Sequence, residues 1–278
     1  MKVGIIGLPS TGKSTLFSLL TGAPAPAPGG RPEPRVGIAR VPDPRVEALA
    51  DLYQPKKKTP ATVEYVDMPG VAKGEGAALV DLPALRGVDA LVHVVRAFAS
   101  DVVPHPEGSI DPLRDARMLE LELILADLGT VERRLERLEA NIKKLNKAED
   151  VAERVVFLKI KDALESEKPL RDLPLTEDEQ RKLRGYALLS GKPLVLVVNM
   201  GEEQIRQAAA QLQATGLNDF AAEGPGRAVC AVSAPIEAEM AQLSAEDARA
   251  FREDLGLQEP GLDRVIRTSY ELLGLISF

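Results

Sequence analysis

The sequence reads G-L-P-S-T-G-K-S-T from Gly7 to Thr15, directly after the apolar run Val3–Ile6 and at the start of a helical stretch, Lys13–Thr21. The glycines let backbone N–H groups turn inward around a phosphate, and the following helix directs its positive end at the same anion. Lys13 supplies a charge for the outer phosphates and Ser14 a hydroxyl for Mg²⁺. The sequence therefore predicts a P-loop with phosphate contacts from Pro9, Ser10, Thr11, Gly12, Lys13, Ser14 and Thr15.

Further short apolar runs predict buried strands, because each is rich in Val, Ile or Ala and is bounded by Gly, Pro or charged residues. These runs are Val63–Val66, Ala90–Val95, Leu194–Val198 and Ala228–Val232. Helical stretches lie between the runs, and strands alternating with helices predict a mostly parallel sheet covered on both faces. Pro and Gly crowd residues 22–44, which predicts a long loop with little regular structure. The expected fold class is α/β, of the P-loop NTPase type.

A charged, almost glycine-free region from about Asp115 to Ser190 interrupts this alternation and is predicted to be helical. Its apolar residues recur at steps of three and four, which is the heptad spacing of a helix that packs against another helix. These residues are Leu121, Ile124, Leu128, Val131, Leu135, Leu138, Ile142 and Leu145. A second stretch, Val151–Leu164, could return antiparallel, and Thr176 to Glu179 resembles a capped helix start. We expect an inserted coiled-coil hairpin over 115–190 within a nucleotide-binding domain formed by 1–114 and 191–278; the alternative is two surface helices packed on the sheet.

Composition limits the class of protein. The net charge is −7 and Trp is absent, which disfavours a general nucleic-acid-binding protein, and local basic patches such as Lys56–Lys58 are usually solvated faces. No run of 18 apolar residues occurs, so no membrane span is expected. Met1–Ile6 leaves no room for a signal peptide, and the single cysteine, Cys230, cannot form an internal disulfide. A cytoplasmic location is the simplest expectation.

Two further motifs follow predicted strands. D-M-P-G, Asp67 to Gly70, follows Val63–Val66, so Asp67 is a candidate Mg²⁺ ligand and the Gly70 N–H a candidate γ-phosphate contact. N-M-G-E, Asn199 to Glu202, follows Leu194–Val198, where guanine-binding switch proteins carry N-K-x-D. Met200 replaces the Lys and Glu202 the Asp, and the longer Glu side chain is expected to weaken or shift guanine specificity. Asn199, Met200, Glu202, Ser233 and Ala234 are the candidate base contacts; the alternative for Asn199 is a capping residue at a strand end.

These segments resemble the Obg-like ATPase family of the YchF type, within the translation-factor class of P-loop NTPases. The similarity also covers V-P-D-P-R at 41–45, V-D-A-L-V-H-V-V-R at 88–96 and the tail from Ser233 to Phe278, and so nearly the whole chain. The resemblance implies a nucleotide-dependent switch that prefers ATP over GTP, hydrolyses it slowly with Mg²⁺, and is linked to the ribosome. In this family a TGS domain follows, so the sequence is either part of a longer chain or a member without that domain.

Several positions bear on hydrolysis. The family resemblance places a Mg²⁺-capping Thr near Arg31, but no Ser or Thr occurs from Ala23 to Lys58, and residues 70–76 resemble a shortened second switch. Val71 stands where Ras-like enzymes have a water-orienting Gln. The resemblance implies that His105 substitutes as the catalytic residue, and the alternative is a solvent-facing loop histidine. His93, within L-V-H-V-V, is expected to be a core residue.

Two functions fit these observations. The first is a slow ATP- or GTP-hydrolysing switch, with the helical hairpin as the surface that a protein partner, ribosome or ribosomal RNA contacts. The second is a nucleotide-binding interaction protein that no longer switches or hydrolyses, which the missing Thr favours. A P-loop kinase would need an acceptor pocket and a basic lid, and the insertion and the N-x-x-E segment argue against it.

Overall fold

A six-stranded sheet forms the centre of the protein, which the computed structural model describes for residues 1–24, 34–68, 82–145 and 147–275. The strand order is β2-β3-β1-β4-β5-β6, and every neighbouring pair is parallel except β2 with β3. The strands are β1 (Lys2–Ile6), β2 (Arg35–Arg40), β3 (Thr62–Asp67), β4 (Ala90–Arg96), β5 (Leu194–Asn199) and β6 (Arg227–Val232). The predicted mostly parallel α/β sheet is confirmed.

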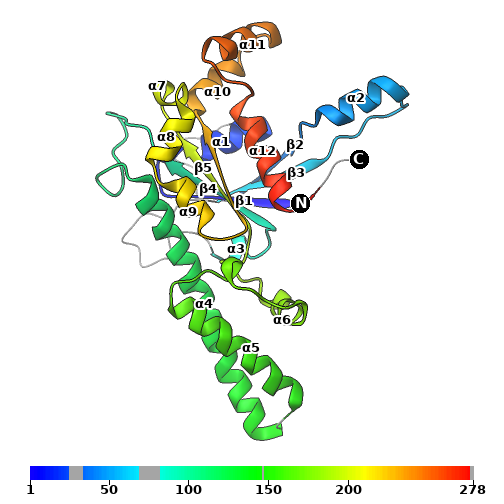
Figure 1. Cartoon of the computed structure of the whole chain (residues 1–278), viewed down its shortest axis with the longest axis vertical. Helices are drawn as coiled ribbons and strands as arrows, with labels where there is room; N and C mark the ends of the chain where they lie inside the picture. The colour runs from blue at the N-terminus through cyan, green and yellow to red at the C-terminus, as the bar shows by residue number, and fades with distance from the viewer. Residues whose placement is uncertain (25–33, 69–81, 146, 276–278) are drawn as a thin grey trace.

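Apolar residues of the strands pack on both faces of the sheet, as expected for parallel strands that read as continuous apolar runs. On one face they meet Leu16 and Phe17 of α1 (Lys13–Thr21) and Val265 of α12 (Gly261–Leu272). On the other face they meet residues of α4 (Pro112–Leu145) and α9 (Leu217–Ala222). Figure 1 shows the resulting arrangement, with the sheet between its helices. The remaining helices are α2 (Pro44–Tyr53), α3 (Leu82–Leu85), α5 (Ala148–Glu165), α6 (Glu177–Leu183), α7 (Glu202–Ile205), α8 (Ala208–Ala214), α10 (Ala234–Met240) and α11 (Ala245–Asp254), with 3₁₀ turns at Leu170–Asp172 and Arg184–Tyr186.

The inserted helical hairpin is α4 with α5, and it projects from the sheet (Figure 1). The second half of α4 packs with α5 around its own core, which includes Val131, Leu138, Phe157 and Ile160. The first half of α4 packs on the sheet instead. The predicted helical hairpin is confirmed, while the alternative of two helices packed on the sheet is wrong for α5 and describes only the first half of α4. The two ends of the predicted stripe, Leu121 and Leu145, stay exposed.

The helix start predicted at residues 176–179 is confirmed. Thr176 accepts a hydrogen bond from the backbone N–H of Glu179, and the Glu179 carboxylate accepts one from the N–H of Thr176. This reciprocal capping box satisfies two N–H groups that the helix itself cannot pair. It begins α6 at the base of the hairpin.

The prediction of an unstructured loop over residues 22–44 is wrong for residues 35–40, which form the edge strand β2. The strand reads R-V-G-I-A-R, and most of its side chains are exposed or half-buried, so no buried apolar run marks it. Its centre fits only glycine, because a Cβ on Gly37 would lie 2.6 Å from the side chain of Thr21. Asp43 then caps α2, accepting a hydrogen bond from the backbone N–H of Arg45, with Pro44 as the first helical residue.

Candidate nucleotide-binding site

The P-loop joins β1 to α1 through a backbone shape that two glycines make possible. Gly7 has φ 148° and Gly12 has φ 94°, which side chains rarely tolerate. The loop is also closely packed: a Cβ on Gly7 would lie 2.4 Å from the Val94 carbonyl oxygen, and one on Gly12 would lie 2.4 Å from Nδ2 of Asn199. The two strands β4 and β5 therefore hold the loop in place at the carboxyl edge of the sheet.

Lys13 lies across the loop with its ammonium group turned onto the loop itself. Its Nζ donates to the Leu8 carbonyl oxygen at 2.6 Å, and the Thr11 hydroxyl donates to the same oxygen at 3.0 Å. Burial lowers the pKa of Lys13 to about 8, although the nearby Asp67 carboxylate opposes the shift. A bound phosphate would supply the negative charge that this buried ammonium lacks.

Asp67, at the end of β3, lies beside Lys13 and Ser14. Burial raises the pKa of Asp67, while a hydrogen bond from Ser14 and the charges of Lys13 and Arg35 oppose the shift. Its Oδ1 is buried and has no hydrogen-bond partner among the described residues.

An unpaired carboxylate oxygen next to a serine hydroxyl is the kind of hard oxygen donor set that suits Mg²⁺, so the residues present fit the ion. In the part of the chain that the structure describes, no three His, Cys, Asp or Glu side chains gather as a metal site. The ion would therefore take its other ligands from nucleotide and water, as Mg²⁺ commonly does.

Arg35 also reaches this site, which no sequence motif indicated. Its Nη1 lies 3.9 Å from Asp67 Oδ2, and its guanidinium carbon lies 4.7 Å from the centre of the Phe17 ring. Register explains the contact, because β2 pairs antiparallel with β3 and brings Arg35 opposite Asp67. Arg35 could have been identified only by predicting the antiparallel edge strand β2. The Pro- and Gly-rich composition around that strand instead indicated a loop.

Asn199 connects the P-loop to the segment after β6. Its Nδ2 donates to the Thr11 carbonyl oxygen at 3.0 Å, and its Oδ1 accepts from the N–H of Ala234 at 3.1 Å. Asn199 is 2 % exposed, so both its amide nitrogen and its amide oxygen form their hydrogen bonds inside the protein. Asn199 therefore braces two loops of the site against each other.

The other candidate base residues divide into buried and exposed ones. Met200 is fully buried in the sheet core, so its side chain cannot lie over a base as the Lys of N-K-x-D does; that expectation is wrong. Glu202 is exposed at the start of α7, with its carboxylate 3.9 Å from Arg206. Ser233 is buried, and its hydroxyl has no partner among the described residues.

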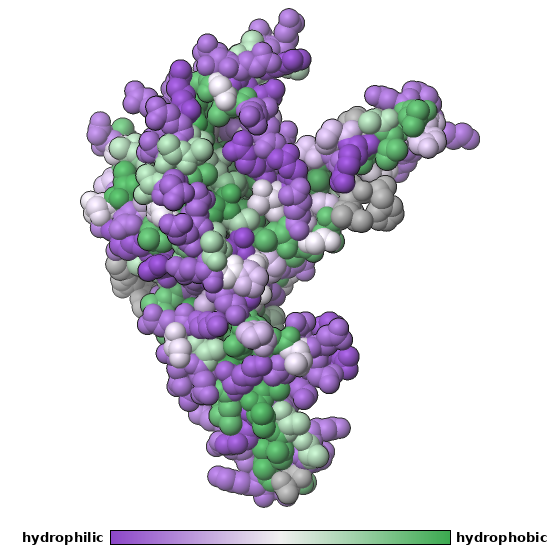
Figure 2. Space-filling model, in the orientation of Figure 1, coloured by the Kyte–Doolittle hydropathy of each residue, from purple (hydrophilic) through white to green (hydrophobic). Residues whose placement is uncertain are grey.

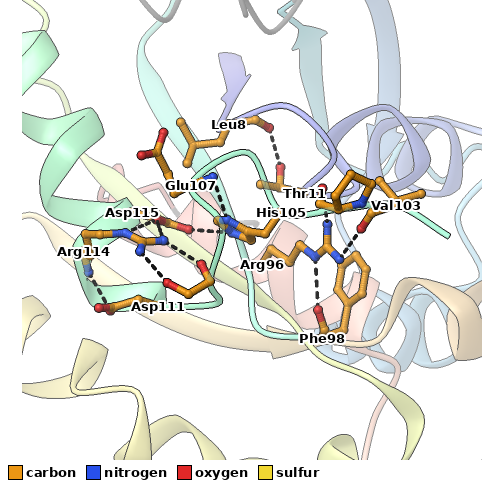
Figure 3. A network of polar contacts seen from close by, with 12 residues as sticks. Leu8, Thr11, Arg96, Phe98, Val103, His105, Glu107, Asp111, Arg114 and Asp115 are labelled. Atoms are coloured by element: carbon orange, nitrogen blue, oxygen red, sulfur yellow. Dashed lines mark hydrogen bonds and ion pairs between the residues drawn. The ribbon is translucent and has the colours of Figure 1, made fainter. Parts of the chain in front are cut away.

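Arg96 holds the loop that runs from β4 toward α4. Its guanidinium donates to the carbonyl oxygens of Phe98 and Val103 at 3.1 and 2.8 Å, and it contacts that of Pro104 at 3.5 Å. Arg96 is 1 % exposed, and Figure 3 shows its guanidinium directed at the loop residues Phe98 and Val103. The sequence signal that could have identified Arg96 is its position as a charged residue at the end of an otherwise mostly apolar strand.

His105 lies in this loop, and its imidazole is 4 % exposed, so the solvent-facing alternative is wrong. Its Nε2 lies 3.0 Å from Asp115 Oδ2, and its Nδ1 accepts the N–H of Glu107 at 3.2 Å (Figure 3). Because Nδ1 accepts, a neutral ring carries its proton on Nε2, and the close approach of Nε2 to Asp115 lacks hydrogen-bond geometry. Arg114 holds the other oxygen of Asp115 at 2.7 Å. In this arrangement Nδ1 has a hydrogen-bond partner and Nε2 lies against the Asp115 carboxylate.

His93 is buried in the sheet, as expected for a core residue. Burial lowers its pKa to about 3, and the positive charge of Lys13 adds to the shift. The ring is therefore neutral at ordinary pH, and its Nε2 has no hydrogen-bond partner among the described residues. Two other expected positions, Gly70 and the switch position near Arg31, lie outside the described residues.

Comparison with known proteins agrees with this geometry. The sequence profile described as "50S ribosome-binding GTPase" matches residues 2–200. The Ribosome-binding ATPase YchF of Bacillus subtilis is 41% identical over 288 residues, covering 100% of this chain and 77% of the relative. The chain belongs to the YchF-type Obg-like family. The YchF protein of Haemophilus ducreyi is 39% identical over 284 residues, with the same coverage.

A solved YchF structure extends the match to the fold. The Schizosaccharomyces pombe YchF GTPase superposes with a TM-score of 0.82 at 28% identity, covering 98% of this chain and 75% of that one. Because the match covers nearly all of this chain, it includes the α4–α5 hairpin as well as the sheet. The family resemblance inferred from the motifs is confirmed, and this YchF-type chain has a P-loop NTPase fold. No described helix is both long enough and apolar enough to cross a membrane.

Proposed function

We propose that this YchF-type chain is a nucleotide-dependent switch that binds ATP or GTP together with Mg²⁺ and hydrolyses it slowly. One observation carries the proposal: a buried Lys13 and a buried Asp67 with an unpaired oxygen lie together at a P-loop that β4 and β5 hold in shape. Neither feature serves the stability of the empty protein, because burying charges without full partners is costly. A magnesium–phosphate group would satisfy both.

Each proposed site residue has a separate task. The backbone N–H groups of residues 10–15, together with that of Gly70, would hold the phosphates, and Pro9, which has no N–H, would contact them only through its ring. Lys13 would neutralise the outer phosphates. Ser14 and Asp67 would hold Mg²⁺, which when bound shields phosphate charge from the attacking water. Asn199 would brace the base loop, while Glu202, Ser233 and Ala234 would border the base. The exposed Glu202 carboxylate can accept an exocyclic N–H, which adenine and guanine both offer.

His105 is the proposed catalytic residue, but only after its ring leaves Asp115. The contacts of both nitrogens limit the proportion of molecules in which the ring could orient water, and this is consistent with slow turnover. The same observation favours a second candidate, a nucleotide-binding interaction protein that does not hydrolyse. The two differ in phosphate release over many turnovers.

Partners and boundaries are also proposals. The relatives are named ribosome-binding ATPases, so we propose a ribosomal contact, by protein or ribosomal RNA, through the projecting α4–α5 hairpin. We propose 1–114 with 191–278 as the nucleotide-binding domain, 115–190 as the insertion, and the cytoplasm as the location. The separate core of the hairpin supports this division, although Leu119 and Leu123 anchor α4 on the sheet.

The first experiment is a titration of the chain with fluorescent ATP and GTP analogues, with and without Mg²⁺, using Lys13→Ala as the control. We expect saturable binding that Mg²⁺ strengthens and the substitution abolishes, followed by phosphate release above one equivalent. Binding without multiple-turnover phosphate release would favour the interaction protein. No saturable binding of either nucleotide would refute both candidates.

A further inference from the structure

Helix α2 projects away from the sheet, beyond the ends of β2 and β3 (Figure 1). None of its described side chains is buried. A ten-residue helix is marginal in water unless one face packs on something, because nucleation is costly and few hydrogen bonds follow it. The Asp43 cap and Pro44 assist its start, but among the described residues no other helix or strand covers its length.

The helix nevertheless has an apolar face. Val46, Leu49, Ala50 and Tyr53 recur at the spacing of one helix side, and we call them the α2 stripe. Leu49 is 48% exposed and Tyr53 74%, and Leu52 beside them is 72% exposed. We call residues 35–61, which carry α2 away from the sheet, the arm, and Figure 2 shows apolar side chains gathered on it. Single exposed apolar side chains are common on protein surfaces, whereas a group of large ones usually marks a contact site.

Two cavities border the α2 stripe. One of about 360 Å³ lies between the stripe and the segment from Pro55 to Thr59, and one of about 370 Å³ lies between Val46 and the segment from Arg40 to Asp43. Their lining combines aliphatic and aromatic carbon with three basic groups, Arg40, Lys57 and Lys58, and one acidic group, Asp43. Such cavities accept apolar side chains and attract flanking carboxylates.

The arm also differs in charge from the rest of the chain. Residues 35–61 contain six Arg or Lys and three Asp or Glu, whereas the whole chain has a net charge of −7. Lys56, Lys57 and Lys58 are all exposed and follow directly on the end of α2. We call Lys56, Lys57 and Lys58 the lysine border. A partner that covers the α2 stripe therefore meets positive charge at this border.

We propose that the α2 stripe and its lysine border bind an acidic, amphipathic segment of another protein. A partner helix of two to three turns matches α2, since ten residues span about 15 Å. Its apolar side chains would occupy the two cavities, and its carboxylates would lie near Lys56 and Lys57. This surface is independent of the nucleotide site, so the proposal does not rest on the proposed activity.

Protein fits this surface better than RNA. A sequence-tolerant RNA site needs several aromatic platforms along a basic groove, and here Tyr53 is the one aromatic residue in α2. Leu49, Leu52 and Val46 gain nothing from a phosphate backbone. Their exposure beside lysines is explained by a partner that is apolar and acidic at once.

The test uses the full 278-residue chain and a displayed library of random 16-residue peptides, and enriched peptides are then measured by fluorescence anisotropy. We expect peptides rich in Asp and Glu with apolar residues three or four apart. Leu49→Ser with Tyr53→Ser is expected to weaken their binding at least tenfold. Lys56→Glu with Lys57→Glu, or 0.5 M salt, is expected to weaken it severalfold. All of these side chains are exposed, so the variants keep the fold, which circular dichroism verifies.

Matched controls have the same chemistry elsewhere on the surface. Leu125→Ser replaces an exposed leucine of α4, and Lys143→Glu with Lys144→Glu reverses two lysines near the hairpin tip; neither is expected to change peptide binding. The proposal is overturned if no enriched peptide distinguishes the Ser variant from the parent chain. It is also overturned if Leu49 and Tyr53 instead support binding of a 16-nucleotide RNA, or a dimer of this chain seen by sedimentation.

Discussion

Lys13 changes charge within a pH range that is accessible to experiment. Its pKa is about 8 in the protein without nucleotide, because burial disfavours the ammonium. A bound phosphate raises this pKa, so binding favours the protonated form. Below pH 8 the ammonium is already present, and above pH 8 each binding event must take up a proton.

We therefore predict that nucleotide affinity is nearly constant from pH 6.5 to 7.5 and falls between pH 8 and 9.5, by up to about tenfold per pH unit. Calorimetry in buffers of different ionisation enthalpy measures the accompanying proton uptake at pH 9. Equal affinity at pH 7 and 9 with no proton uptake would contradict the assigned role of Lys13.

Asp67 supplies the second residue-level prediction. Asp67→Asn keeps the shape of the side chain but removes the charge of the buried, unpaired oxygen. We expect the strengthening of nucleotide binding by Mg²⁺ to fall at least about tenfold, since a carboxylate holds the ion far better than an amide does. Nucleotide affinity measured without Mg²⁺ should change by no more than a fewfold. Any change should be a gain, because the substitution removes a negative charge near the phosphates. Asp89→Asn, at a carboxylate that accepts from the Lys2 N–H, is the matched control.

At the residue scale, the sequence indicated the candidate site groups that belong to a local motif. Lys13, Ser14 and Asp67 were predictable because the P-loop and the strand-end Asp follow fixed spacings. Arg35 and Asp115 were not, because strand pairing and a loop-to-helix contact bring them to their partners. Met200 was misread because its position in the motif says nothing about which side of the chain faces the core.

At the scale of elements, the loop from β4 to α4 is held at both ends. Arg96 fixes its beginning, and the contact of His105 with Asp115 fixes its end on the first turn of α4. The described part of the loop that carries the proposed catalytic histidine is therefore tied to the hairpin. Any movement that frees the imidazole must break the contact with Asp115.

Asp115→Asn is predicted to release the His105 ring more often. Loss of a charge-assisted contact worth about 1.5 kcal/mol raises the released population by roughly tenfold, and slow hydrolysis is expected to rise by up to that factor. Single-turnover phosphate release measures the effect. His105→Ala should lower the rate and should remove the gain in the double variant. An unchanged rate in Asp115→Asn would show that release of the ring does not limit hydrolysis.

Elements were predictable where apolar residues follow one period. The strands at β1, β3, β4, β5 and β6 read as short apolar runs, and α1 begins and ends as predicted. The edge strand β2 gave no such signal, because Val36 and Ile38 are exposed and only Ala39 is buried. In α4 the heptad pattern was continuous although its two halves pack on different partners, since sheet and helix both accept the same apolar stripe.

Across the whole molecule, a buried charged network joins the hairpin to the sheet. Glu120 of α4 pairs with Arg171 and, at 3.2 Å, with Arg227 of β6, and Arg227 also pairs with Asp172 at 2.8 Å. Both arginine side chains are at most 2% exposed. A network without solvent is sensitive to the loss of any one charge, because its partners are then left buried and unpaired.

Arg227→Met is therefore expected to lower the free energy of unfolding by about 3 to 5 kcal/mol, since Glu120 and Asp172 lose a buried partner. Arg117→Met, which removes an exposed pair with Glu223, is expected to change it by less than about 1 kcal/mol. Urea unfolding followed by circular dichroism compares the two. Similar losses in both variants would contradict a special role for the buried network.

The continuous length of α4 has a mechanical consequence. Its 34 residues form one rod of about 51 Å, with its first turn at the His105 contact and its far end at the tip of the hairpin. Leu119 and Leu123 seat the rod on the sheet close to that first turn and so act as a fulcrum. The part of α4 from this fulcrum to the tip is about four times as long as the part from the fulcrum back to Asp115. If α4 pivots there as a rigid rod, a shift of about 1 Å at the Asp115 end moves the tip of the hairpin by about 4 Å, so the helix would amplify small motions.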